Sequence, residues 1–235
     1  MTALAVATAL AILPDIAVAD NIKPIFYAQM VAAHAKLADF KYLFPERDRP
    51  VTGLLHLPDF DIGKSFLGQQ IEIRNYSGEF FDALTGSPAT PITLNPDASK
   101  NTLFWDRLDP HFQAPLIAAY GPKGGASKDV IGEGSLAFLF DKGICEFGFK
   151  TLPESSLRSF GPNLPKGPLK ITFYDEAAKP LGVAFFGNAN LSSYAFAVNS
   201  QSAVLIKAIT LENIDPEGIG ISNLLYLETC SPDVS

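Results

Sequence analysis

A flat aromatic side chain stands among hydrogen-bonding groups in the segment from Asn101 to Phe112. Trp105, the only tryptophan of the chain, is followed directly by Asp106 and Arg107. An aromatic ring can stack on the C–H face of a sugar, while acidic, amide and guanidinium groups bind the sugar hydroxyls. The segment does not have the pattern of a regular strand. These three residues are candidate ligands for a glycan, and the alternative is that Trp105 anchors the core beneath a long loop.

Tyr76 and Tyr120 are further aromatic candidates of the same kind. A second type of site is suggested by Asp215 and Glu217, which lie in a polar turn between two apolar runs near the end of the chain. Their carboxylates, with neighbouring carbonyl groups, could bind a calcium ion, which prefers several oxygen ligands. The alternative is a plain hairpin turn, in which Pro216 fixes φ.

Signatures of catalysis are weak throughout the sequence. There is no G-x-S-x-G elbow, the spacing before Gly63-Lys64-Ser65 is wrong for a phosphate-binding loop, and the histidines stand apart from any recognisable nucleophile. Asp59 with Asp61, or Asp106 with Asp109, could hydrolyse a glycosidic bond only if the two carboxyl groups faced each other across a cleft. We expect these acids to be solvated loop residues, and we assign no catalytic residue and no certain cofactor.

Composition excludes several classes of protein. The 235 residues are 47% hydrophobic, which is enough for a sizeable core and excludes a disordered chain. The formal net charge is −7 and no Lys or Arg cluster occurs, so the sequence offers nothing to a phosphate backbone. The 18 Phe, 18 Gly and 18 Pro favour strands broken by many turns.

The first nineteen residues resemble a targeting segment. Residues 1–19 are small and apolar and end in Ala17-Val18-Ala19, the pattern that a signal peptidase cleaves. The alternative is a buried N-terminal helix. Cleavage after Ala19 predicts a mature chain outside the cytoplasm with no membrane span. In that compartment Cys145 and Cys230 could form a disulfide, although two buried free thiols also fit the sequence.

The chain changes character near residue 50. Within a lead-in of residues 20–50, apolar and aromatic residues recur near helical spacing, which predicts one helix from Pro24 to Phe44. Residues 51–230 contain short apolar runs separated by turn residues, as in an all-β sandwich, and 231–235 form a tail. The predicted strands are Thr52–Leu57, Gln70–Tyr76, Leu116–Tyr120, Ser135–Phe140, Cys145–Lys150, Leu169–Tyr174, Val183–Phe186, Ala195–Val198, Leu205–Leu211 and Ile219–Tyr226.

Alternation within two of these strands predicts which side chains enter the core. Successive side chains of a strand point to opposite faces. Cys145, Phe147 and Phe149 should therefore share one face, and Ile171 and Phe173 should point inward.

The succession GSLAFLF, ICEFGF, LKITFYDEAAKPLG, FFG and IKAITLENIDPEGIGISNLLY resembles exported bacterial β-sandwich domains of the kind found in PEP-CTERM-type surface proteins. The resemblance covers residues 57–226 and implies a jelly-roll-like sandwich that is similar to carbohydrate-binding modules. That family commonly has Asp in an I-D-N-L motif where this chain has Ser222, which argues against a cation there. The family's sorting tail is also absent, so we expect a freely secreted or truncated form.

Together these observations predict an all-β, jelly-roll-like two-sheet sandwich with a short N-terminal helical segment. The expected function is a non-catalytic binding or adhesion module, secreted or at the bacterial cell surface. Its expected partner is a glycan or a component of the extracellular matrix, with no nucleic acid. Two alternatives remain open, a glycan-active hydrolase or lyase and a self-associating matrix or filament subunit, because a fold does not decide function.

Overall fold

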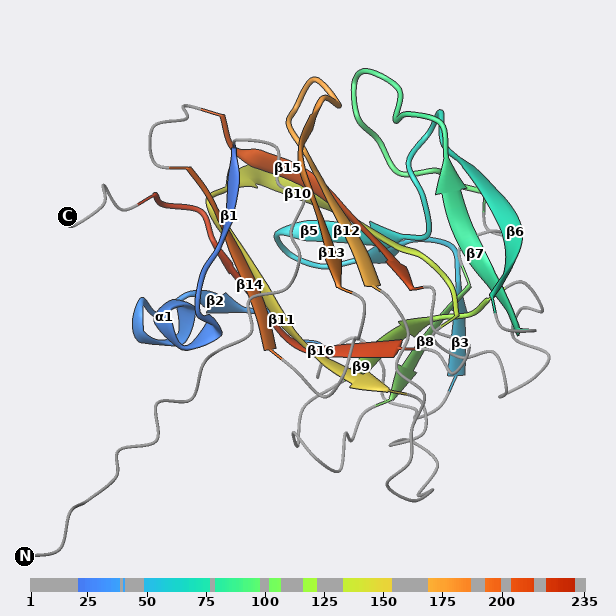
Figure 1. The fold of residues 1–235 in the computed structure, drawn as a ribbon, viewed down its shortest axis with the longest axis horizontal. Helices are drawn as coiled ribbons and strands as arrows, with labels where there is room; N and C mark the ends of the chain where they lie inside the picture. The colour runs from blue at the N-terminus through green and yellow to red at the C-terminus, as the bar shows by residue number, and fades with distance from the viewer. Residues whose placement is uncertain are drawn as a thin grey trace, which may run out of the picture.

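The protein is an antiparallel β-sandwich (Figure 1). The structure is a computed structural model and describes residues 21–38, 40, 49–76, 79–97, 102–106, 116–121, 133–153, 169–186, 193–199, 204–213 and 219–230. The all-β fold with a short helical segment that the sequence predicts is confirmed. No helix among these residues is long and apolar enough to cross a membrane.

One layer is an eight-stranded sheet with the order β1-β14-β11-β16-β9-β8-β3, in which β2 also pairs with β16. Its strands are β1 (Ile22–Pro24), β2 (Lys36–Leu37), β3 (Arg49–Thr52), β8 (Thr102–Asp106), β9 (Leu116–Ala119), β11 (Glu146–Pro153), β14 (Ser193–Val198) and β16 (Ile219–Leu227).

The second layer is a six-stranded sheet with the order β13-β12-β15-β10-β5-β4. Its strands are β4 (Leu55–His56), β5 (Phe60–Gly63), β10 (Leu136–Ile144), β12 (Leu169–Tyr174), β13 (Pro180–Phe186) and β15 (Ile206–Asn213). The chain crosses from this sheet to the other between β10 and β11, between β13 and β14, and between β15 and β16, as in a jelly roll. A separate hairpin consists of β6 (Gln70–Tyr76) and β7 (Glu79–Thr85).

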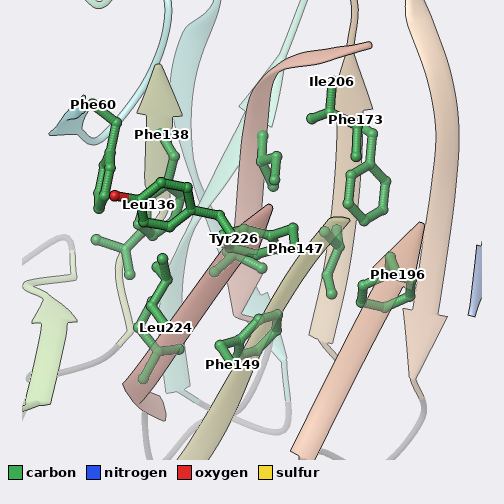
Figure 2. Packing of buried hydrophobic residues seen from close by; sticks show 14 of the residues in the cluster. Phe60, Leu136, Phe138, Phe147, Phe149, Phe173, Phe196, Ile206, Leu224 and Tyr226 are labelled. Atoms are coloured by element: carbon green, nitrogen blue, oxygen red, sulfur yellow. The ribbon is translucent and has the colours of Figure 1, made fainter. Parts of the chain in front are cut away.

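Phenylalanine rings fill the space between the two sheets. Phe173 of the six-stranded sheet lies 5.0 Å from Phe196 of the other, and Phe138 lies 5.7 Å from Phe147, measured between ring centroids. Figure 2 shows these rings directed toward one another from strands of both layers. Ile171, Phe173, Phe147 and Phe149 are all fully buried, which confirms the inward faces that strand alternation predicts.

The N-terminal lead-in differs from the sequence prediction. Instead of one helix from Pro24 to Phe44, the only α-helix among the described residues, α1, spans Tyr27–Ala32 and is flanked by β1 and β2. Its helical run ends before His34, which adopts a positive φ of 55°, and the next residues pair with the open side of β16. Strand pairing with the sheet therefore overrides the local helical spacing.

The helix packs on the outer face of the eight-stranded sheet, where Met30 contacts Ala195 and Leu225. Met30 is fully buried, whereas Val31 is 56% exposed. A Cβ at Gly148 would lie 2.7 Å from the Met30 sulfur, so the absence of a side chain on β11 allows this close approach. The predicted strand Thr52–Leu57 is also interrupted, because Gly53 has a φ of 98° and separates β3 from β4.

The outer face of the six-stranded sheet is covered as well. Phe66, Ile92 and Leu94 pack over it, against side chains of β10, β12 and β15. Beside them, the β7 backbone bonds to the sandwich at two points: the Asp82 N–H donates to the Glu133 carbonyl at 3.1 Å, and the Leu84 N–H donates to a Glu212 carboxylate oxygen at 3.0 Å.

A buried ion pair fixes the hairpin in place. The Lys64 ammonium pairs with the Asp82 carboxylate, and both side chains are less than a tenth exposed. The ammonium also donates to the Tyr120 carbonyl at 2.7 Å. Burial raises the pKa of Asp82, and the neighbouring Lys64 charge opposes that rise.

Removing one partner of this pair should destabilise the protein more than replacing both. We expect Lys64→Met to cost about 3–5 kcal/mol of unfolding free energy, because it leaves a buried carboxylate without its counter-charge. The double variant Lys64→Met/Asp82→Leu should recover a large part of that loss. Urea unfolding of wild type, both single variants and the double variant measures the effect. Strictly additive losses would contradict the pairing.

Candidate functional site

The aromatic candidates from the sequence do not form one platform. Trp105 and Asp106 lie on β8 of the eight-stranded sheet, which corrects the expectation that this segment is not a strand, and their side chains lie outside the described part. Arg107 lies outside the described residues. Tyr76 ends β6 in the separate hairpin, and Tyr120 is only 4% exposed, so its ring is not available to stack on a ligand.

The strand register gives the location of residue 105 in the sheet. Trp105 is paired with Ile117 of β9, and Ile117 is paired with Ile221 of β16. Residues directly opposite each other in antiparallel strands belong to the same face of the sheet. Ile117 and Ile221 lie in the core, so position 105 belongs to the core face of this sheet.

The calcium site at Asp215 and Glu217 stays a prediction. Asp215 and Glu217 lie outside the described residues, between β15 and β16. Within the described ranges no three His, Cys, Asp or Glu side chains are grouped as metal ligands. Ser222, where the resembling family has Asp, is completely buried, and its hydroxyl oxygen has no hydrogen-bond partner among the described groups.

The sequence left open whether the cysteines are paired. In the structure Cys145 and Cys230 form a disulfide that joins the start of β11 to the segment after β16, with their Cα atoms 5.4 Å apart. This covalent link lies at the same end of the sandwich as the hollow described next.

A hollow of about 570 Å³ opens at the end of the sandwich where β10 leads into β11. Three segments far apart in the sequence line it: the second half of β10, the turn between β12 and β13, and the start of β15. The lining residues are Asp141, Lys142, Gly143, Asp175, Glu176, Ala177, Val204, Leu205 and Lys207. We call this hollow the turn-end groove.

Strand order explains why these segments meet. In the six-stranded sheet β15 lies between β12 and β10, so the residues that precede β15 adjoin both neighbours. The β10–β15 register shifts between Leu139 and Ile144, which lets β10 bend away from β15 there. A Cβ at Gly143 would lie 2.6 Å from the Leu205 Cβ, so this wall of the groove requires glycine.

The turn between β12 and β13 is held rigidly by its own hydrogen bonds. The Lys179 N–H donates to the Asp175 carboxylate at 2.8 Å, and the Asp175 N–H donates to the Lys179 carbonyl at 3.0 Å. Ala178 completes the reversal with a positive φ of 62°. The Thr90 hydroxyl also donates to the Ala177 carbonyl at 3.0 Å, which ties the turn to the cover of the sheet.

The groove offers hydrogen-bond donors and hydrogen-bond acceptors beside a small apolar surface. Asp141, Asp175 and Glu176 provide carboxylate acceptors, and Lys142 and Lys207 provide ammonium donors. The Lys207 ammonium donates to the Asp141 carbonyl at 2.9 Å and so links two walls. Val204 is 39% exposed and adds apolar contact area. Such a surface suits a neutral ligand with many hydroxyl groups.

The groove and position 105 lie at opposite ends of the sandwich. The groove residues of β10 immediately precede β11, whereas the partner of Ile221 on β11 is Thr151, near the far end of that strand. Figure 1 shows the turn between β12 and β13 at the top of the view and β8 at the bottom. In the sequence this turn lies between the predicted strands Leu169–Tyr174 and Val183–Phe186, and nothing local indicates that distant acids and lysines surround it.

A polar cluster behind the groove holds Asp141 in position. The Asp141 N–H donates to the Asp59 carbonyl at 2.9 Å, and the Asp59 carboxylate accepts a 2.5 Å hydrogen bond from the Tyr226 hydroxyl. Lys36 pairs with Glu228 at 2.6 Å and with Asp59 at 3.5 Å. The Tyr226 hydrogen bond lowers the pKa of Asp59, and burial raises the pKa of Tyr226.

No protein-family model matches the chain, and no curated protein matches it. Among solved structures it is similar to a variant of CBM29-2, a family 29 carbohydrate binding module complexed with mannohexaose: the identity is 13%, the match covers 77% of this chain and 92% of that chain, and the TM-score is 0.33. A second variant of CBM29-2 matches with 13% identity, 80% and 100% coverage, and a TM-score of 0.32. These TM-scores are too low to support a shared fold or a shared function. The fold and the site of this protein are therefore described from its own residues.

The Asp59–Tyr226 hydrogen bond predicts a pH-dependent stability. Because the native state lowers the pKa of Asp59, the bond stabilises the protein above the unfolded carboxyl pKa of about 3.9, and this contribution is lost as the pH falls through the lower native pKa. Tyr226→Phe keeps the ring and removes the donor. We expect the melting temperatures of wild type and Tyr226→Phe to differ most at neutral pH and to converge in acid. A constant difference across this range would contradict the assignment.

Proposed function

We propose that the protein is a non-catalytic binding module whose ligand is a glycan and whose binding site is the turn-end groove. The observation that carries this proposal is the combination of carboxylates, ammonium groups and the exposed Val204 side chain in one hollow of about 570 Å³. Sugars present hydroxyl groups that both donate and accept hydrogen bonds, together with apolar C–H faces. Both kinds of polar group in the groove therefore have a partner on such a ligand.

The rigidity of the groove favours binding. Two of its walls are fixed by backbone hydrogen bonds: the Asp175 N–H donates to the Lys179 carbonyl in the turn, and the Asp141 N–H of β10 donates to the Asp59 carbonyl. A pre-formed site orders few side chains when the ligand binds, which reduces the entropic cost of association.

A glycan-active hydrolase is the second candidate, and one observation favours it. Asp141, Asp175 and Glu176 line the same hollow, and glycoside hydrolysis needs two carboxyl groups on either side of the scissile bond. Asp175 is already engaged in holding its turn, which leaves Asp141 and Glu176 as the pair that would act.

Binding to the groove can be tested with substitutions of its lining residues, compared with a control substitution of a lysine outside the groove. A glycan array would identify a ligand, and calorimetry would then compare wild type with Lys142→Ala, Lys142→Ala/Glu176→Ala and Lys23→Ala. The last variant removes a lysine from β1 in the other sheet. We expect the double variant to lose at least tenfold in affinity, because hydrogen bonds to charged groups each contribute about 1.5–3 kcal/mol. Lys23→Ala should bind like wild type.

Three results would change this assignment. Wild type that binds no glycan would remove the glycan ligand. Binding that survives the double variant but is lost in Trp105→Ala would move the site to the other end of the sandwich. Release of reducing ends by wild type, abolished in Glu176→Gln, would establish the hydrolase instead.

We further propose that the protein is exported and acts at the cell exterior, in adhesion or matrix binding. The Cys145–Cys230 disulfide supports this proposal, because such bonds persist mainly in oxidising compartments. The small apolar segment of residues 1–19 supplies the expected targeting signal.

Export can be tested on protein recovered from a secreting host. We expect N-terminal sequencing to begin at Asp20 and thiol titration under denaturing conditions to detect no free cysteine. Reduced protein serves as the positive control and should release two thiols, since the chain has 2 Cys. Protein that keeps residues 1–19 and two free thiols would contradict export.

A further inference from the structure

The outer strand of the β6–β7 hairpin is an open sheet edge. Among the described residues, β6 pairs only with β7, and β7 attaches the hairpin to the sandwich. Figure 1 shows β6 on the far side of β7 from the two layers. An unpaired edge strand is a template for pairing with another chain unless its sequence prevents it.

The hydrogen bonds of β7 define which groups of β6 face this edge. Asp82 and Leu84 direct their N–H groups away from β6, to Glu133 and Glu212. Their partners in the register are Ile73 and Ile71. In an antiparallel pair, residues of such a non-hydrogen-bonded pair both point their N–H and C=O groups outward. Ile71 and Ile73 therefore present backbone donors and acceptors to the open edge.

The side chains of the edge match an antiparallel copy of themselves. Ile73 is 63% exposed, and Phe80, on the same face of the hairpin, is 45% exposed. Glu72 and Arg74 flank Ile73 on the opposite face, and their exposed side chains form a 3.3 Å ion pair. If two β6 strands meet antiparallel with Ile73 opposite Ile73, each Glu72 lies directly opposite an Arg74 of the second copy.

We propose that two copies of this protein associate through β6, with antiparallel pairing centred on Ile73. The Ile73 pair would be hydrogen-bonded and would bury exposed apolar surface, and the two Glu72–Arg74 pairs would fix the register. Opposite charges across strands are favourable and like charges are unfavourable. A two-fold interface uses the same strand of both copies, so the assembly closes as a dimer and does not extend into a filament.

This association is independent of the proposed glycan site. None of the residues that line the turn-end groove belongs to β6 or β7. Loss of sugar binding would leave the dimer intact, and loss of the dimer would leave the affinity of each groove unchanged. The two proposals can therefore fail separately.

Charge exchange on β6 provides the test. Sedimentation of the full chain over a concentration series would compare wild type with Glu72→Arg, Glu72→Arg/Arg74→Glu, Ile73→Lys and Val31→Lys. Glu72→Arg places like charges opposite each other at two points and should raise the dimer dissociation constant at least tenfold. The exchanged double variant restores opposite charges and should recover dimerisation.

The remaining variants distinguish a charge placed at the β6 edge from a charge placed elsewhere on the surface. Ile73→Lys brings two charges to the centre and should give monomers, whereas Val31→Lys, an exposed apolar position on α1, should dimerise like wild type. Melting temperatures verify that each variant is folded. A monomeric wild type, a dimer insensitive to Glu72→Arg and Ile73→Lys, or a double variant that stays monomeric would overturn the proposal. A heterologous peptide that binds β6 of a monomeric wild type would also overturn it.

Discussion

The layer of phenylalanine rings between the two sheets is the constraint on which the rest of the structure depends. Phe60, Phe138 and Phe140 of the six-stranded sheet contact Phe147 and Tyr226 of the other sheet through ring pairs 5.6 to 6.1 Å apart. Burying such rings is the main favourable term in folding, and offset or edge-on packing adds to it. Both sheets must present one apolar face to satisfy this layer. A ligand can therefore reach the sandwich only at its turns and sheet edges and at its outer surface, not between the sheets.

The outer face of the six-stranded sheet is a second apolar surface, and other segments of the chain cover it. Residues such as Phe66 and Leu94 shield it, and polar groups at its margin are paired rather than solvated: Glu212 binds both the Leu84 N–H and the Lys170 ammonium, the latter at 2.7 Å. Because the hairpin is attached through β7, its other strand, β6, has no second neighbouring strand among the described residues. The exposed edge is thus a geometric consequence of covering the sheet.

Much of the sandwich could be predicted from the sequence, because strand alternation is a local signal. Gln70–Tyr76 and Leu169–Tyr174 have the predicted bounds, and every other predicted strand overlaps an observed one. The lead-in could not be predicted, because its helical spacing competes with pairing partners on β16 that are almost two hundred residues away. The segment around Trp105 was misjudged for a similar reason: β8 is a strand through its pairing with β3 and β9.

The candidate site was harder to predict than the fold. An acid followed by an acid at Asp175, or by a lysine at Asp141, is an ordinary pattern in any sequence. Only the order β10-β15-β12 reveals that these segments adjoin one hollow. Among the aromatic residues that looked most informative, Trp105 belongs to strand β8 and Tyr120 is buried. Most of the described phenylalanine side chains pack in the core.

The separation of the groove from the open edge affects how strongly the protein could bind a repeating ligand. The groove lies at one end of the sandwich, between β10, the β12–β13 turn and the start of β15, whereas β6 is an edge of the separate hairpin. Pairing through β6 would leave both grooves open and hold them at a fixed separation. A second binding event on the same glycan chain then becomes intramolecular, with an effective concentration that reaches the millimolar range when the span between the sites fits. If the groove binds a glycan as proposed, such a dimer would attach more tightly than a single groove, because avidity and not the single site would set the strength of binding.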